Sequence, residues 1–390
     1  MQEQKETLLD YSKRLETVKK QIQALKKPEK ENLFDFSLRY CEKKKLSPAR
    51  HLKLLVVMKK CIEYAGKPLT SFKEKDLESI NIKLAQKGVS KITINDYRKF
   101  LSQYFHWAGQ KNFVESEELK RLKLNGENKI RAIDLPTEEE TFAMLQALNI
   151  KYRAMLSLFF GGGLRLSEAT TLKRGDIEFK DNKSIICHVT GKTGSRSVPI
   201  TPSLACFVTE YVNKAGIQDN QALFPGENGK KFLSYAAIKK AFKRAAIKTG
   251  IDGKRKTNVH IFRHAHATWS LLNLPAPLAK VRLWGSATSR MDQSYLHVSE
   301  AESHDAYNKA TGQVKEQPKK ELFENKVCFK CGKSFNALAS VCDNCNLPLN
   351  PGEIINRETE TQKRFERLEQ NLQRVLLLLG KEKGFVKAKN

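Results

Sequence analysis

The stretch NVHIFRHAHATWSLLNLPAPLAKVRLWGSATSRMDQSYLHVS, from Asn258 to Ser299, decides how the rest of the chain is interpreted. It begins with His260 and Arg263, three residues apart at the predicted start of a helix, and it leads to Tyr295 in the sequence YLHVS. A histidine, an arginine and a tyrosine in one basic chain favour covalent phosphate chemistry on DNA, which requires partner residues elsewhere in the sequence.

The composition favours a polyanionic partner. The 390 residues are enough for about two or three domains, and 70 Lys and Arg against 43 Asp and Glu give a net charge of +27. Such an excess is costly in self-repulsion unless nucleic acid relieves it. No segment of the sequence is apolar enough to span a membrane, and the first ten residues lack the apolar core of a signal peptide. We therefore expect a cytoplasmic, DNA-associated protein.

The first third of the chain predicts a helical domain. Residues 1–28 have the spacing of an amphipathic helix, and residues 29–112 carry apolar side chains at three- and four-residue steps, which indicates about four or five helices. Residues 113–136 are polar and are interpreted as a linker. After it, Thr137 and Glu140 form the pattern of a helix capping box. Five basic residues would give the helical domain a basic face, although such runs are also common on plain solvated surfaces: Lys43, Lys44, Lys45, Lys91 and Arg98.

Two further cations follow in residues 137–312. Arg165 comes directly after three glycines and a leucine, and these residues alone favour a helix cap in which Arg165 bridges to Glu168. Lys192 lies at the tip of a predicted β-hairpin, where a solvated lysine is the plain alternative. A predicted helix capped by Ser234 carries a basic stripe suited to DNA phosphates: Lys239, Lys240, Lys243, Arg244 and Lys248.

These motifs, taken together, resemble those of the tyrosine recombinase (phage integrase) family. They are Arg165 in GLRLSE, Lys192 in GKTGSR, the His260-x-x-Arg263 pair and Tyr295, and they match in order and spacing. The resemblance implies a mainly α fold with a small antiparallel β-sheet (α+β). It implies a SAM-like core-binding domain at 29–112 and a tyrosine recombinase catalytic domain at 137–312. The phrase SRM before YLHVS is similar to archaeal members.

The resemblance also implies roles for these residues. Tyr295 would attack the scissile phosphate to give a 3′-phosphotyrosyl link, so that neither ATP nor a catalytic metal is needed. Arg165 and Arg263 would hold the non-bridging oxygens, and Lys192 would protonate the leaving 5′-oxygen. His260 would assist proton transfer at the tyrosine or orient the phosphate. The partner would be double-stranded DNA, with a homotetramer on paired sites.

One position departs from the pattern of the family. The family places His or Trp after a glycine shortly before the tyrosine, whereas this chain has Trp284 before Gly285. Trp284 is carried over as the catalytic candidate, and a packed aromatic ring is the alternative. Its indole can donate one hydrogen bond but cannot transfer a proton. His264 and His266 are expected to have structural roles only.

The tail of the chain predicts a metal site. Two Cys-x-x-Cys pairs lie within residues 326–350, and this spacing indicates a closed, structural Zn²⁺ site of the zinc-ribbon type, more than a redox dithiol pair. The four ligands would be Cys328, Cys331, Cys342 and Cys345.

Residues 353–380 predict a helix or short coiled coil, which would pack on the ribbon or contact another protomer. Its apolar positions are Phe365, Leu368, Leu372, Val375 and Leu379.

The sequence thus predicts a site-specific DNA recombinase or integrase, with integration and excision of a mobile element as the favoured role. Xer-type resolution of chromosome dimers is the alternative within the same chemistry. A catalytically inactive DNA-binding relative is disfavoured by the complete set of catalytic residue types. A type IB topoisomerase is disfavoured by the core-binding-domain layout.

Overall fold

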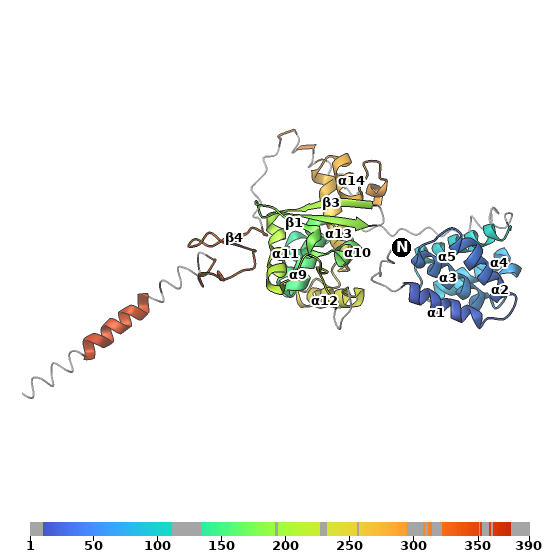
Figure 1. Cartoon of the computed structure of the whole chain (residues 1–390), viewed down its shortest axis with the longest axis horizontal. Coiled ribbons are helices and arrows are strands. Elements are labelled where there is room, and N and C mark those ends of the chain that lie inside the picture. Colours follow the sequence, from blue (N-terminus) through green and yellow to red (C-terminus); the bar gives the residue numbers. More distant parts are fainter. Residues whose placement is uncertain are drawn as a thin grey trace, which may run out of the picture. The chain divides into compact units, whose positions relative to one another are not determined.

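The computed structural model describes residues 11–110, 134–191, 194–226, 232–255, 257–294, 322–350 and 362–375, with residues 304, 307–308, 311–313, 352 and 359. The chain divides into two compact units, Met1–Ile130 and Arg131–Asn390. Most of the chain is helical in both units (Figure 1).

The first unit is built from helices alone in its described part. Aromatic rings form much of its core, because Phe36 stacks on Tyr40 at 4.9 Å and meets Tyr104 and Trp107 edge-on. The elements are α1 (Tyr11–Gln23), α2 (Glu29–Asp35), η1 (Phe36–Glu42), α3 (Pro48–Ala65), η2 (Leu69–Ser71), α4 (Glu74–Gln86) and α5 (Lys91–Trp107).

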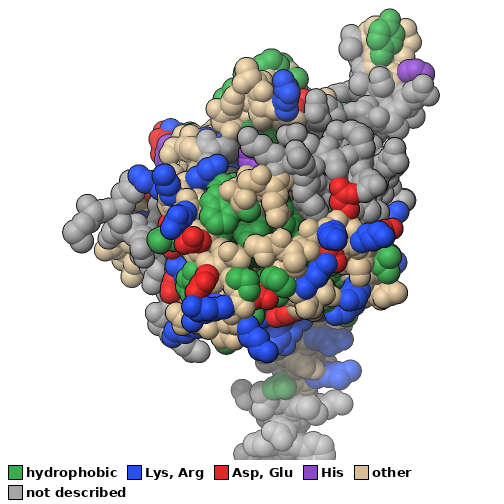
Figure 2. All heavy atoms as spheres, turned by 90° about the vertical axis from the view of Figure 1, so that its right-hand side faces the viewer, with side chains coloured by type: hydrophobic (Ala, Val, Ile, Leu, Met, Phe, Trp, Pro, Cys, Tyr) green, Lys and Arg blue, Asp and Glu red, His purple; other side chains and the backbone are tan. Residues whose placement is uncertain are grey.

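Basic side chains are spread over the surface of this unit. Lys43, Lys44, Lys45 and Lys91 are exposed, and Arg98 is half-buried. Figure 2 shows lysine and arginine side chains distributed over the face turned to the viewer, with acidic side chains among them. The positive charge on the visible face is therefore dispersed among acidic side chains.

The second unit is organised around a helix that is apolar on almost every side. This helix is α9 (Ile150–Gly162), which packs against α8, α10, α11, α13 and strand β3. The predicted capping box before α8 is confirmed, since Glu140 N donates to Thr137 Oγ1 at 3.2 Å and Thr137 N donates to Glu140 Oε2 at 2.9 Å. The other helical elements are α8 (Glu138–Ala147), α10 (Leu166–Thr171), η4 (Arg174–Asp176), α11 (Pro202–Ala215), α12 (Tyr235–Lys248), α13 (Val259–Asn273), α14 (Ala276–Trp284) and η5 (Met291–Ser294).

A three-stranded antiparallel sheet lies against these helices (Figure 1). Its order is β1 (Ile177–Phe179), β2 (Ile185–Gly191) and β3 (Gly194–Ile200). β2 and β3 form the predicted hairpin, with Gly191 opposite Gly194. Lys192 lies between them and falls outside the described residues. The prediction of a mainly α fold with a small antiparallel sheet is confirmed.

The cysteine-bearing segment folds as a small ribbon with strands β4 (Lys326–Val327) and β5 (Ser334–Phe335). It packs on the helices of the second unit through Asn336, which follows β5, and through Phe323, which precedes β4. Asn336 Nδ2 donates to Glu210 Oε2 at 2.6 Å, and the Phe323 ring lies against those of Phe142 and Phe160. The ribbon therefore has a fixed position beside α11. Residues of the ribbon and of α11 line a pocket of about 570 Å³.

The described part of the C-terminal tail ends in a helix at residues 362–375, all of whose residues are exposed. Among the described residues, no helix combines the length and apolar character needed to cross a membrane.

Candidate functional site

Arg165 is fixed by the way one helix ends and the next begins. Gly163 ends α9 in the left-handed conformation, with φ 60°, and Arg165 is the N-cap of α10. Arg165 N donates to Glu168 Oε2 at 2.7 Å, and its Nη1 donates to Glu168 Oε1 at 2.6 Å. The bridge expected from the sequence is present, yet 23% of the Arg165 side chain stays exposed. The guanidinium is thus held in place and still accessible.

A second arginine completes the surroundings of Glu168. Arg196, on strand β3, donates from Nη1 to Glu168 Oε1 at 2.6 Å and from Nη2 to Oε2 at 2.8 Å. The Glu168 side chain has no exposed surface. Burial by itself would raise the pKa of this carboxyl, but the hydrogen bonds from Arg196 and Arg165 prevail and lower it to about 2. Glu168 is therefore ionised at neutral pH between two cations.

Glycine is required where strand β2 reaches this carboxylate. A Cβ atom added at Gly191 would lie 2.7 Å from Glu168 Oε1, closer than side-chain carbons approach other atoms. The missing side chain lets the end of β2 close over the Glu168 carboxylate. Gly191, the residue before Lys192, therefore lies beside the cluster formed by Arg165, Glu168 and Arg196.

Arg263 joins the ends of two helices. It projects from the second turn of α13 and is buried to 1% exposure. Its Nη1 donates to the carbonyl of Gly163, at the end of α9, and its Nη2 donates to the carbonyl of Leu283 at 2.9 Å, near the end of α14. Carbonyls at helix C-termini lack helical partners and carry partial negative charge, so they offset the cost of burying this cation.

His260 lies one helical turn before Arg263 on α13. Its ring packs edge-on against His264, with the centroids 4.8 Å apart. Partial loss of water around the ring, together with the charges of Arg263 and Arg165, lowers the pKa of His260 below its usual value. These charges act on His260 because both arginines lie near it, so the structure brings three of the predicted catalytic residues together. The imidazole is neutral at pH 7 and able to accept a proton.

Two other side chains of this region are buried. His266 Nδ1 donates to the Phe160 carbonyl at 2.8 Å, and burial lowers the pKa of His266 to about 3, which agrees with the structural role expected for it. Trp284 is 3% exposed and packs with Ala267 and Leu283. The packing matches the alternative considered for Trp284, and its catalytic role stays a prediction. Tyr295 lies outside the described residues.

Arg196 and the central role of Glu168 were missed from the sequence. A signal was nevertheless present, because side chains alternate between the faces of a strand. Arg196 shares its face with the fully buried Val198 and Ile200. An arginine at an inward-facing position requires a buried anion, and Glu168, one turn after a predicted phosphate-binding arginine, was the available one.

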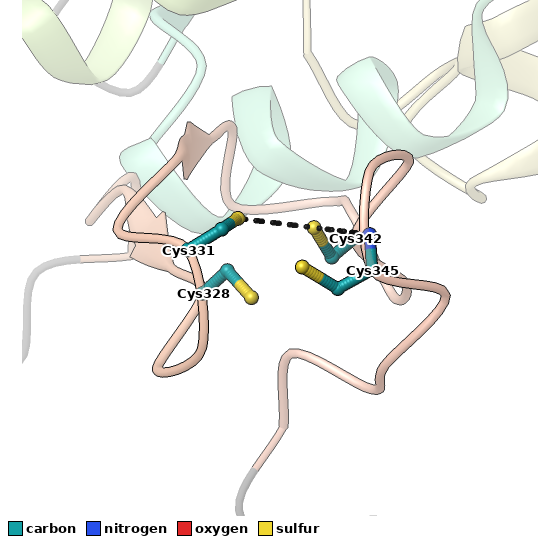
Figure 3. A group of neighbouring side chains, drawn as sticks. All are labelled: Cys328, Cys331, Cys342 and Cys345. Carbon is teal, nitrogen blue, oxygen red and sulfur yellow. Dashed lines mark hydrogen bonds between the residues drawn. The ribbon is translucent and has the colours of Figure 1, made fainter.

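The four cysteines of the ribbon form a second candidate site, suited to a metal ion (Figure 3). Their sulfur atoms all lie within 4.8 Å of one another, and those of Cys331 and Cys342 are 3.7 Å apart. A tetrahedral thiolate site with bonds of about 2.3 Å sets its sulfurs about 3.8 Å apart. Gly332 and Asn346 follow the two pairs with φ of 68° and 54°, the left-handed turn that such knuckles need. The donor set fits a metal ion.

Comparison with known proteins gives a consistent result. Residues 134–302 match the family described as the Phage integrase family. A tyrosine recombinase of Thermosipho africanus (strain TCF52B) is 24% identical over 262 residues, covering 65% of this chain and 89% of that protein. The tyrosine recombinase XerC of Chlamydia trachomatis serovar L2 is 32% identical over 175 residues, covering 42% of this chain. The chain spans about half of that relative's length, 53%.

Solved structures show the same fold. A lambda integrase dimer bound to a COC′ core site matches with a TM-score of 0.54 at 14% identity, covering 69% of this chain and 96% of that one. The Tn1549 transposon integrase in complex with a circular intermediate DNA matches with a TM-score of 0.53 at 16% identity, covering 76% of this chain and 99% of that one.

Replacing Glu168 with glutamine should destabilise the second unit by about 3 kcal/mol, because it leaves the buried Arg196 and the partly buried Arg165 without their counter-charge. The pKa of Glu168 is lowered in the folded protein, so its stabilisation is present above the usual glutamate pKa and is lost as pH falls towards about 2. The gap between wild type and Glu168→Gln should therefore shrink on acidification. Urea unfolding between pH 7 and pH 2 measures this. Glu178→Gln, at an exposed ion pair, is the matched control and should change little; equal effects of the two substitutions would contradict the role of Glu168.

Removing the charge of Arg165 should raise the pKa of His260, because that charge disfavours the imidazolium. NMR titration of the histidine Cε1–H signals in wild type, Arg165→Gln and Arg165→Lys measures the effect, with His260→Gln to assign the signal. The lysine variant keeps the charge and should stay close to wild type. If the pKa of His260 were the same in wild type and in Arg165→Gln, the charge of Arg165 would not act on His260, which would contradict the proximity of the two residues.

Proposed function

Because the chain belongs to the phage integrase family of tyrosine recombinases, enzymes that cut and rejoin DNA, we propose that it exchanges DNA strands at specific sites through a 3′-phosphotyrosyl intermediate on Tyr295. The observation that carries this proposal is the accessible Arg165 guanidinium, held by the buried Glu168 and close to His260 and Arg263. Two cationic groups and one proton-accepting group thus lie near one another, and we propose that they act on one phosphate.

The arginines supply electrostatic stabilisation. As Tyr295 attacks, negative charge develops on the non-bridging oxygens of the phosphate, and planar guanidinium donors that are already in place stabilise it without reorganisation. Arg165 can stay oriented during this change because Glu168 accepts from both its backbone and its side chain. Arg263 is oriented in a similar way by the carbonyls of Gly163 and Leu283.

Proton transfer accompanies the displacement. The tyrosine oxygen forms a bond to phosphorus while the bond to the 5′-oxygen breaks, so one proton leaves the tyrosine and one is gained by the leaving oxygen. His260, neutral at pH 7, accepts the first, and Lys192 donates the second. Attack by a 5′-hydroxyl of another strand reverses the step and completes the exchange. The phosphate bond energy is kept in the phosphotyrosine, so no ATP is consumed.

The favoured role is integration and excision of a mobile element, carried out by a homotetramer on paired double-stranded DNA sites. The ribbon and helix that follow the matched residues 134–302 support this choice, because a Xer-type resolvase usually ends soon after its tyrosine. Xer-type resolution remains the second candidate, and it is favoured by the 32% identity to a XerC over 175 residues.

We also propose that the four ribbon cysteines hold a structural Zn²⁺. All four positions are protein thiolates, so such a site keeps no open position for substrate. The metal would hold together a segment whose described strands are only two residues long and whose cysteines otherwise have few apolar neighbours.

Covalent chemistry on Tyr295 can be tested with nicked duplexes selected from a random pool for binding to the full chain. Wild type should form a protein–DNA adduct on a denaturing gel in the presence of EDTA, and Tyr295→Phe should form none while binding the same duplexes. Arg165→Lys should reduce the yield by about a hundredfold or more, since it removes a preorganised transition-state donor. DNA binding by wild type without any adduct would instead support the inactive DNA-binding relative.

Removal of the metal should unfold the ribbon while the helices of the second unit stay folded, because the ligands all lie within the ribbon. Elemental analysis of the purified chain should give one zinc per chain, and Cys331→Ser should lower this content and make the ribbon sensitive to protease. Cys206→Ser, outside the ribbon, is the control and should keep the zinc. Full zinc content in Cys331→Ser would argue against the four-cysteine site.

A further inference from the structure

The C-terminal helix at residues 362–375 carries an apolar stripe that nothing in the described structure covers. All of its residues are exposed. Its four large apolar side chains are more than half exposed: Phe365 at 61%, Leu368 at 57%, Leu372 at 64% and Val375 at 52%. Aligned apolar side chains left in water mark a surface that a partner covers.

The spacing of this stripe defines the geometry of the partner. Phe365, Leu368, Leu372 and Val375 follow one another at steps of three, four and three residues, which are the a and d positions of a heptad repeat. With Phe365 at a, the b, c and f positions, which face away from such a seam, are all polar or charged: Lys363, Glu366, Arg367, Gln370, Gln373 and Arg374. The helix therefore has one narrow apolar seam, as in a two-stranded coiled coil, and not the wider face of a helix buried in a globular core.

We propose that this helix pairs in parallel with the same helix of a second copy of the chain. The flanking charges select both the partner and the direction. In the same register Arg364 occupies a g position and Glu369 the following e position, five residues later. In a parallel pair each g side chain meets the e side chain of the partner five residues on, so Arg364 and Glu369 form two symmetric ion pairs.

The antiparallel arrangement lacks this complementarity. It sets g positions against g and e positions against e, so that Arg364 would face Arg364 or Asn371, and Glu369 would face Glu369 or Gln362. None of these combinations joins opposite charges, and two of them oppose like charges. The sequence around the seam thus favours a parallel homodimer over an antiparallel one.

The length of the helix sets the strength of the contact. The fourteen residues at 362–375 form two heptads, close to the lower limit at which helices are stable in water. The pair should therefore be weak between free chains. Once two chains are held on one DNA molecule, the effective concentration of the helices reaches about the millimolar range, and a weak contact becomes populated. This contribution on DNA rests on the proposed function, whereas the pairing itself does not.

Charge reversal tests the pairing in the full chain carrying Tyr295→Phe, so that strand cleavage plays no part. Sedimentation equilibrium gives the dimer dissociation constant, and gel shifts on a duplex with two copies of a selected binding site give the cooperativity. Arg364→Glu or Glu369→Arg alone should weaken the dimer about tenfold, because each turns two attractive pairs into two repulsive ones. The double variant Arg364→Glu/Glu369→Arg restores opposite charges and should return both measurements towards wild type.

The control is Glu366→Arg, which makes the same change of charge at an outward b position and should leave both measurements at the wild-type level. Circular dichroism of each variant checks that helix content is kept. Equal weakening by Glu366→Arg and Glu369→Arg would show a general charge effect and overturn the proposal. So would a double variant as weak as the single ones, or the absence of any change in both measurements. None of these outcomes bears on adduct formation at Tyr295, which is tested separately.

Discussion

A buried carboxylate shared by two arginines joins α10 to strands β2 and β3. The Glu168 side chain has no exposed surface, and Arg165 and Arg196 both donate to it. One negative charge between two guanidinium groups leaves a net positive charge in a region of reduced polarity, which is costly unless an anion joins the cluster. Since Arg165 alone of the two keeps substantial exposure, the incoming anion would be bound on its side. The interaction that stabilises the fold therefore also orients the partly exposed Arg165 guanidinium.

Arginine serves a second structural purpose in this unit, as a partner for helix ends. Arg263 donates to the carbonyls of Gly163 and Leu283, and Arg196 Nε donates to the carbonyl of Arg282 at 3.1 Å. Two cations thus meet the C-terminal end of α14, where carbonyls without helical partners concentrate negative partial charge. Arg196 and Arg263 therefore hold the end of α14 in place.

The sequence predicted the parts of this site that local patterns encode. His260 and Arg263 could be recognised because they lie one turn apart near the start of one helix, and Arg165 because it closely follows a helix-ending glycine. The cluster around Glu168 was not predicted, since Arg196 lies 28 residues away on a different element. Periodicity reports which face a side chain occupies, but it does not report which distant group it meets there. For Trp284, burial could be foreseen from residue type, but its neighbours depend on how α13 and α14 pack.

The ribbon and the C-terminal helix differ in how they contact the rest of the second unit. Asn336 connects the ribbon to α11, and Phe323 connects it to α8 and α9. These direct contacts fix the position of the ribbon relative to the helices of the second unit. The described residues of the terminal helix are all exposed, and in the proposed pairing a second copy of the chain covers its apolar seam. A long, stable coiled coil would hold copies together at all times, whereas two heptads hold them only when another force has already brought them close. In the proposed strand exchange, in which copies assemble on DNA and then release their products, a contact of this limited strength would be an advantage.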